Sequence, residues 1–176
     1  MIDIVLGDIA DTHMTAIMHP VSAEWDPVTP AMRRLELAAG TEITEQCRKL
    51  GELPIGSAVI TGAGAAKAEF MVHVIVRSMV EAVSESGVQR ALQNGLRRCV
   101  EWGIEAIAIP PIGTGAGNLD AEEVAHLMLP VLLDHMRDAQ YPARVLLVAD
   151  SEYERDAFQQ VLAYHDLPTL SEDPRP

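Results

Sequence analysis

Basic residues and long apolar runs are both scarce in this sequence. There are 13 Lys and Arg residues against 26 Asp and Glu, which leaves a formal net charge of −13. A chain of this charge repels polyanions and lacks the basic face that nucleic-acid binding needs, so we expect no nucleic-acid polymer among its partners. Apolar runs such as residues 70–76 fall far short of the roughly 20 residues that span a bilayer. We therefore expect a cytoplasmic protein with no membrane partner.

Cysteine is also rare, and its positions exclude a cysteine-based site. Cys47 and Cys99 lie far apart and form no Cys-x-x-Cys pair, so we predict two buried free thiols, no metal site and no cofactor. At 176 residues the chain has the length of one ordinary domain. We place that domain at residues 1–165 and expect a loosely ordered tail at 166–176, where the sequence turns polar and rich in proline.

Short apolar runs alternate with helical patterns along the domain. The runs that predict strands are residues 2–6, 16–18, 57–61, 70–76, 104–109 and 145–149. Several of them are apolar almost throughout, as interior strands buried on both faces are. The alternation predicts an α/β fold in which helices cover a sheet.

Capping patterns mark where the helices begin. Ser86 with Gln89, Asp120 with Glu123 and Ser151 with Glu154 pair a short polar side chain with a residue three positions later. An earlier helical stretch over residues 30–50 is interrupted at Gly40, where Thr41 can cap its second half.

A glycine-rich segment between a predicted strand and a capped helix is the most informative feature. Gly113, Gly115 and Gly117 allow the backbone to approach a pyrophosphate closely, and the helix start behind them is partly positive. The alternative is a tight connection that only needs positive φ angles. Asn118 stands where a Rossmann fingerprint has its third glycine, and no Gly-Lys-Ser/Thr occurs, so a dehydrogenase or an NTPase is poorly supported.

A second candidate is Asp8, directly after the first predicted strand. Its carboxylate can accept a hydrogen bond from an exocyclic amine while the N–H of Ile9 donates to a ring nitrogen, which together would recognise adenine. The alternative is an Asx turn.

In order along the chain, these segments resemble the macro domain family. The resemblance rests on Gly7-Asp8-Ile9, on residues 16–18, on residues 56–61 before a Val-His-Val strand at 72–74, and on residues 109–117; it covers roughly residues 2–160. It implies a three-layer α/β/α macro-domain fold with a central mixed sheet and a cleft for ADP-ribose. The ligand-binding residues that it implies are Asp8, Ile9, Ser22, Ile112, Gly113, Thr114, Gly115, Ala116, Gly117 and Asn118.

The segment after the second strand departs from the family pattern. Residues 19–22 read His-Pro-Val-Ser where the family has Asn-Ala-Ala-Asn, and residues 25–31 replace the glycine run that follows. The family's hydrolases use those asparagines and glycines, so no catalytic role carries over. His19 and Asp26 remain as weak acid/base candidates. Ala149 stands where an aromatic residue often stacks on adenine; Tyr153 is either a substitute or a surface residue.

Three functions follow from these features. The first is a reader that binds ADP-ribose or a related adenine nucleotide, free or attached to a protein, without consuming it. The second is an ADP-ribosyl hydrolase or O-acetyl-ADP-ribose deacetylase, which the missing asparagines oppose. The third is a degenerate fold that serves protein contact, which the intact glycines at 113–117 oppose.

Overall fold

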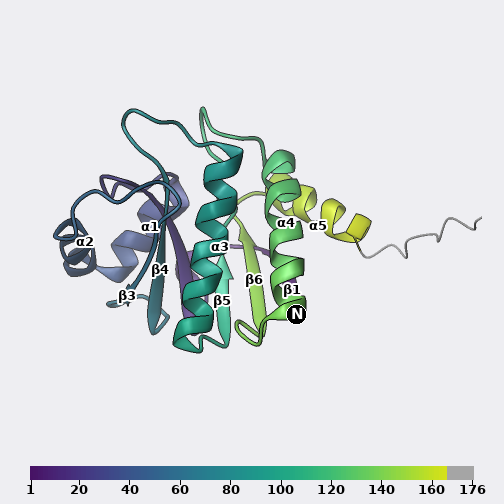
Figure 1. Ribbon diagram of the computed structural model, residues 1–176, viewed down its shortest axis with the longest axis horizontal. Helices are drawn as coiled ribbons and strands as arrows, with labels where there is room; N and C mark the ends of the chain where they lie inside the picture. The colour runs from purple at the N-terminus through teal and green to yellow at the C-terminus, as the bar shows by residue number, and fades with distance from the viewer. Residues whose placement is uncertain (166–176) are drawn as a thin grey trace, which may run out of the picture.

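One mixed sheet of six strands, in the order β1-β6-β5-β2-β4-β3, forms the centre of the computed structural model (Figure 1). The structure describes residues 1–165; the predicted tail at 166–176 lies outside the described residues. The strands are β1 (Ile2–Leu6), β2 (Ala16–Ser22), β3 (Ala58–Gly62), β4 (Phe70–Arg77), β5 (Ala106–Ile109) and β6 (Arg144–Ala149). Neighbours are parallel except β3 and β4, which are antiparallel. The predicted α/β fold with a central mixed sheet is confirmed.

Helices cover both faces of this sheet. They are η1 (Ile9–Asp11), α1 (Pro30–Ala39), α2 (Thr41–Arg48), α3 (Glu85–Trp102), α4 (Ala121–Asp138) and α5 (Glu152–His165). Figure 1 shows α3 and α4 in front of the sheet, and one core cluster joins them and α5 to it. A second cluster joins the opposite face to α1, α2 and η1. Within residues 1–165, no helix is both long enough and apolar enough to cross a bilayer.

Side chains along the central strands alternate between these two clusters. On β4, Val72 and Val74 face α3, while Met71 and Ile75 face the α1 and α2 layer. This is the period of two that a strand imposes on its side chains. This alternation determines which side chains of β2 and β4 contact each other beneath α1.

Strand β2 is longer than the sequence predicts. It continues past Met18 through Pro20 to Ser22 and is buried along its whole length. Its pairing with β5 is limited to Ala16 and Ile17, so Pro20 lies beyond that pairing and its missing N–H disrupts no bond to β5. Because Pro20 interrupts the apolar run, the sequence pattern does not predict the second half of the strand.

The helix starts agree with the sequence in part. Asp120 and Glu123 form the predicted capping box, and the Ser151 hydroxyl accepts a hydrogen bond from the Glu154 N–H. The prediction for α3 is wrong by two residues, because Ser84 is the N-cap and its hydroxyl accepts from the Gly87 N–H. At α2, Gly40 is the N-cap with φ +95°, and no side chain caps the helix. The predicted Thr41 cap is therefore wrong.

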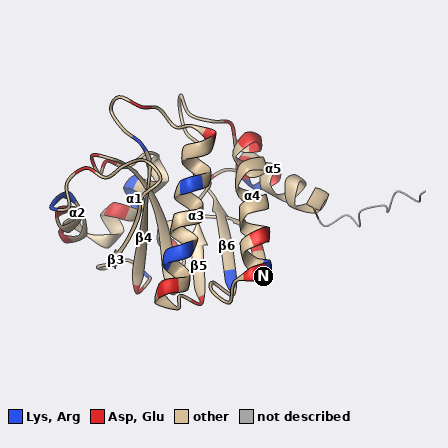
Figure 2. Ribbon diagram, in the orientation of Figure 1, with Lys and Arg blue, Asp and Glu red and all other residues tan. Residues whose placement is uncertain are grey.

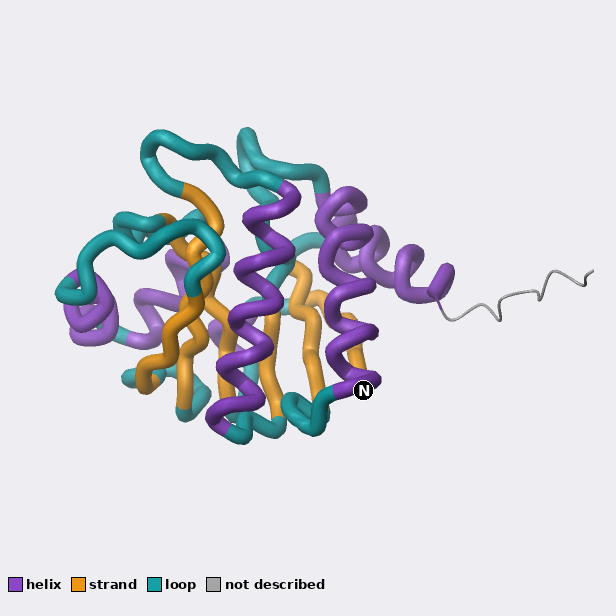
Figure 3. The backbone as a smooth tube through the Cα atoms, viewed as in Figure 1, coloured by secondary structure: helices purple, strands orange, loops and turns teal. Residues whose placement is uncertain are grey.

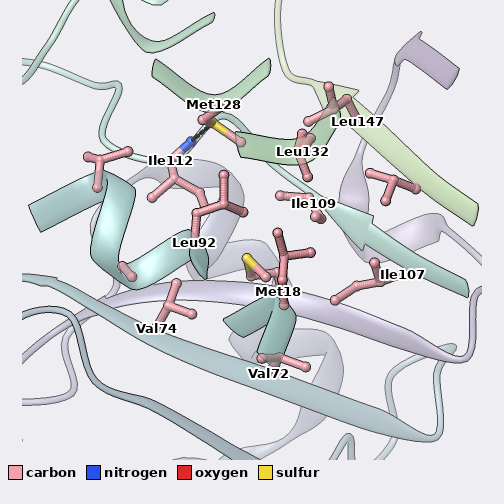
Figure 4. Packing of buried hydrophobic residues seen from close by; sticks show 14 of the residues in the cluster. Met18, Val72, Val74, Leu92, Ile107, Ile109, Ile112, Met128, Leu132 and Leu147 are labelled. Carbon is pink, nitrogen blue, oxygen red and sulfur yellow. Dashed lines mark hydrogen bonds between the residues drawn. The ribbon is translucent and has the colours of Figure 1, made fainter. Parts of the chain in front are cut away.

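The start of the glycine-rich segment is anchored in the core. Ile112 is fully buried, and its N–H points at the sulfur of Met128 on α4, with 3.2 Å between nitrogen and sulfur (Figure 4). At Gly113, φ is +98° and a Cβ would come within 2.7 Å of Val88 and 3.0 Å of Val83. Only glycine fits there, because both the backbone angle and the space exclude a side chain.

Candidate functional site

A cleft opens at the carboxyl ends of the parallel strands, between the loops that follow β2 and β5 and beside the ends of β1 and β6. Strands β2 and β5 are parallel neighbours, yet α1 after β2 covers one face of the sheet and α4 after β5 covers the other. Figure 3 shows the loops that follow β4 and β5 emerging at one end of the sheet. Chains that leave adjacent strands toward opposite faces leave a crevice between them, and α/β proteins bind ligands at such switch points.

The cleft has a volume of about 150 Å³. Its walls come from the start of η1, the start of α1, the glycine-rich loop and the turn between β6 and α5. The lining residues are Gly7, Ile9, Thr29, Pro30, Ala31, Pro110, Pro111, Thr114, Gly115, Val148, Asp150 and Glu154. Apolar and backbone surfaces therefore dominate, with carboxylates at one side.

The glycine-rich loop crosses the cleft toward the start of α1. Gly115 has φ +118°, and a Cβ there would lie 3.4 Å from the Thr29 methyl carbon and 3.6 Å from the Val28 carbonyl oxygen. The Asn118 side-chain amide donates to the Thr114 carbonyl at 3.2 Å, which closes the loop on itself. The backbone of Gly115 is thus exposed where the two loops lie close to each other.

Glu154 ties this loop to the start of α5. One carboxylate oxygen accepts from the Thr114 hydroxyl at 3.0 Å, and the other accepts from the Asp150 N–H at 2.9 Å. A carboxylate engaged on both oxygens is held in one place, so Glu154 sets the position of Thr114.

An ion-pair cluster occupies the η1 side of the cleft. Asp8 uses one oxygen to accept from the Ala10 N–H at 3.0 Å, which is the predicted Asx turn, and the other to accept from Arg34 Nε at 2.7 Å. The Arg34 Nη2 group donates to the carboxylate of Asp150. Hydrogen bonding to Asp8 raises the pKa of Arg34 above its usual value.

The segment after β2 folds into a compact turn. The Asp26 N–H donates to the Ser22 hydroxyl at 3.1 Å, and the Ser22 N–H donates to the Asp26 carbonyl at 3.0 Å. Trp25, with φ +69°, is buried, and its indole N–H donates to the Gly51 carbonyl at 2.7 Å. This anchor leaves only residues 29–31 of the segment to line the cleft.

His19 belongs to a buried polar chain beneath α1. Its Nδ1 lies 2.8 Å from Nδ1 of His73, whose Nε2 lies 2.8 Å from the Thr61 hydroxyl. That hydroxyl donates to the Gly62 carbonyl, so it accepts from His73 Nε2–H, and His19 Nδ1–H then donates to His73. His19 Nε2 lies 3.1 Å from the Glu36 carboxylate, but the contact lacks hydrogen-bond geometry, which leaves this nitrogen without a partner among the described residues.

The structure brings some of the predicted site residues together and separates others. Ile9, Thr114 and Gly115 line the cleft, and Asp8 lies at its rim. Ser22, Ile112 and Gly113 are buried in packing, whereas Ala116 and Gly117 are exposed and Asn118 is half-buried. His19 and Asp26 do not line the cleft; the Asp26 carboxylate is exposed, 3.8 Å from Arg48. Tyr153 is exposed, and its hydroxyl donates to Asp120.

Reasoning from the sequence misses Arg34, Glu154 and Trp25 as parts of the site. Arg34 reads as one of two adjacent arginines on an ordinary helix, and its carboxylate partners are distant in sequence. In the sequence, Glu154 is recognisable only as part of the capping pattern with Ser151. The sequence gives a partial signal for the contact between His19 and His73, because both lie in or beside predicted strands. Only the register of β2 against β4 shows that they lie opposite each other.

The two cysteines of residues 1–165 are buried thiols. Burial raises the pKa of the Cys47 thiol to about 11 and that of Cys99 to about 12, so both stay protonated at neutral pH. In the described part of the chain, no group of three or more His, Cys, Asp and Glu side chains is arranged to hold a metal ion.

Known proteins resemble this chain in sequence and in fold. The family model of the macro domain matches residues 31–128, more than half of the chain. A macro domain-containing protein of Caldanaerobacter subterraneus is 28% identical over 160 residues, covering 87% of this chain and 91% of its own. One from Methanosarcina mazei is 26% identical over 159 residues, covering 88% and 82%.

Two solved structures share the fold at low identity. The Oceanobacillus iheyensis macrodomain with ADP has a TM-score of 0.84 at 22% identity, covering 92% of this chain and 90% of its own. The Trypanosoma brucei macrodomain in complex with ADP-ribose has a TM-score of 0.82 at 13% identity, covering 92% and 68%.

We expect stability to fall in acid because of His73. Burial, and then the neighbouring His19, hold the pKa of His73 well below its ordinary 6.5. The folded state then binds fewer protons than the unfolded state once the pH drops below about 6.5, so this contribution is complete above that pH and is lost below it, by up to about 1.4 kcal/mol per pH unit.

Urea unfolding from pH 7.5 to 4.5 measures this effect, with His73→Gln against the parent. The His73→Gln profile should be flatter between pH 6.5 and 5, whereas His126→Gln, at an exposed position, should match the parent. Parallel profiles for the parent and His73→Gln would contradict the assignment.

Proposed function

The chain belongs to the macro domain family, and on that premise we propose that its cleft binds ADP-ribose or a related adenine nucleotide, free or attached to a protein, as a reader. The observation that carries the proposal is the open cleft between Gly115 and the start of α1, at the switch point of the sheet. Relatives of the same fold have been solved with ADP and with ADP-ribose.

The two sides of the cleft suit the two ends of such a ligand. Ile9 and Val148 offer apolar surface to a base beside the carboxylate of Asp8. At the other side, Gly115 exposes backbone to a diphosphate without a side chain in the way. Backbone N–H groups can hold phosphate where the overall charge is unfavourable.

The charges around the cleft limit the affinity. Asp8, Asp150 and Glu154 place carboxylates at or beside it, and Arg34 supplies the neighbouring cation. A diphosphate that enters meets repulsion which backbone dipoles must offset. In the segment after β2, Trp25 and Ser22 hold a closed turn, so contacts to a distal ribose are few.

The same turn is the reason to propose binding without efficient turnover. Hydrolysis needs a water or a nucleophile within about 3–3.5 Å of the reacting carbon, and displacement by about 1 Å can cost 10²-fold in rate. His19 lies beneath α1 and the Asp26 carboxylate faces solvent, so neither candidate base lines the cleft. Glu154 does line it, but both of its oxygens are engaged.

Calorimetric titration with ADP-ribose, AMP, ADP and NAD tests the proposal. We expect dissociation constants for ADP-ribose between about 1 μM and 1 mM, which correspond to about −8 and −4 kcal/mol. If several millimolar ligand produces no heat and no thermal shift, the reader function is contradicted.

Replacing Gly115 by valine should abolish this binding while the fold persists. The valine would oppose φ +118° and extend toward Thr29 across the cleft. Gly62→Val is the matched control, because a Cβ added at Gly62 would meet no atom within 4 Å and the residue has no positive φ. If Gly115→Val folds and binds as the parent does, the segment is only a turn.

Release of ADP-ribose from modified glutamate or aspartate should be very slow or absent. Incubation with an auto-modified ADP-ribosyl-glutamate substrate, beside an active relative, measures the rate. If the protein releases ADP-ribose at a comparable rate, and His19→Ala or Asp26→Ala abolishes that release, the protein is a hydrolase and not a reader. The variant that loses activity would then identify the catalytic base.

A further inference from the structure

The loop over residues 78–81, directly after β4, exposes two neighbouring apolar side chains. Met79 and Val80 are 86% and 96% exposed, more than any other large apolar side chain in the described part of the chain. The Ser78 N–H donates to the Glu81 carbonyl at 2.8 Å, and the Ser78 hydroxyl accepts from the N–H groups of Val80 and Glu81 at 3.3 and 3.1 Å. The backbone of this 78–81 loop is therefore held in one shape while its two apolar side chains lie in solvent.

A hydrogen bond and close packing place the 78–81 loop beside both segments that bound the cleft. The Met79 N–H donates to the Glu24 carboxylate at 2.9 Å, which ties the loop to the segment after β2. Two residues after the loop, Val83 lies so close to the segment after β5 that a Cβ added at Gly113 would come within 3.0 Å of it. Figure 3 shows the loops after β4 and β5 at the same end of the sheet. The 78–81 loop thus belongs to the surface around the cleft, although none of its residues lines the cleft itself.

The strand order gives the cleft a direction that leads toward this loop. Along the cleft, Ile9 follows β1, Val148 lies on β6, Gly115 follows β5, and residues 29–31 follow β2. Strand β4 is the next strand beyond β2. In the proposed binding mode the base lies against Ile9 and Val148 and the diphosphate lies at Gly115, so the second ribose extends toward β4. A polypeptide attached to that ribose leaves the cleft beside the 78–81 loop.

We propose that the 78–81 loop contacts the polypeptide to which ADP-ribose is attached and favours an apolar residue beside the modified position. The inference rests on the proposed function, because it needs the nucleotide in the cleft. Covering Met79 and Val80 removes apolar surface from water, and a loop already fixed by hydrogen bonds loses little entropy when it binds. The occupant of this surface is thus the same chain that carries the nucleotide.

The charges around the loop specify this partner further. Between residues 77 and 86, Glu81 and Glu85 are exposed and Arg77 is the only cation. Glu24 adds a carboxylate beside Met79. A polypeptide with Lys or Arg next to its apolar residue complements this charge. We therefore expect the preferred partner to present one apolar and one basic residue beside the modified side chain.

The test uses three peptides in which ADP-ribose is linked to the amide nitrogen of one glutamine, a stable substitute for the ester on glutamate. The residues that flank the modified glutamine are Leu and Lys, Ser and Lys, or Leu and Glu. In calorimetric titrations, the parent should bind the first peptide about tenfold more tightly than the second, because Leu covers apolar surface. It should bind the first peptide about threefold more tightly than the third, because Lys complements the carboxylates.

Variants of the loop identify the contact. Met79→Ser combined with Val80→Ser should remove the preference for Leu over Ser and leave the affinity for free ADP-ribose unchanged, because neither residue lines the cleft. Glu81→Gln should reduce only the preference for Lys over Glu. Leu37→Ser is the matched control, because Leu37 is 76% exposed on α1, and it should bind all three peptides as the parent does. Thermal unfolding verifies the fold of each variant.

Equal affinity of the parent for the three peptides would overturn the proposal. A preference for Leu that the double variant retains would also overturn it, because the contact would then lie elsewhere. If the double variant weakens binding of free ADP-ribose as much as binding of the peptides, the loop only shapes the cleft and the proposal is wrong. Failure of the proposed function is distinguishable: a parent that binds free ADP-ribose but does not distinguish the peptides refutes only the contact, whereas a parent that binds ADP-ribose in no form refutes both.

Discussion

The site depends on the divergence of two parallel neighbours, β2 and β5. The chain leaves β2 toward α1 on one face and leaves β5 toward α4 on the other, and the cleft lies between the two loops that follow these strands. Their pairing is limited to Ala16 and Ile17 of β2, which allows the strands to part early. The cleft is therefore a property of topology, and the side chains decide only what it accepts.

The rigidity of the segment after β2 follows from one buried aromatic residue. Trp25 adopts a positive φ that L-residues avoid at a cost of roughly 1–2 kcal/mol, and its hydrogen bond to Gly51 and its edge contact with His73 hold it there. Ser22 and Asp26 close the turn in front of it. A segment fixed in this way follows one path, and this path leads away from the cleft except at residues 29–31.

The sequence predicts the elements well where a local signal exists and poorly where long-range pairing decides. Apolar runs locate all of the described strands, and the Asp120 capping box locates α4, because both signals lie within a few residues. The second half of β2 escapes prediction because Pro20 looks like a break, although it lies beyond the pairing with β5. At the cleft, the glycine spacing marks the segment that contributes Thr114 and Gly115, whereas the contacts of Arg34 and Glu154 depend on partners that only the folded chain brings near.

The carboxylates of Glu154 and Asp8 are each engaged by neighbours, and this explains how an acidic chain keeps an open site. Glu154 is held by the Thr114 hydroxyl and the Asp150 N–H, and Asp8 by the Ala10 N–H and Arg34. Hydrogen bonds of this kind disperse negative charge into fixed donors, so its repulsion of an incoming anion is reduced without a basic surface. Figure 2 shows basic residues scattered among acidic ones on the helices, which leaves local dipoles and the guanidinium of Arg34 to set the field at the rim.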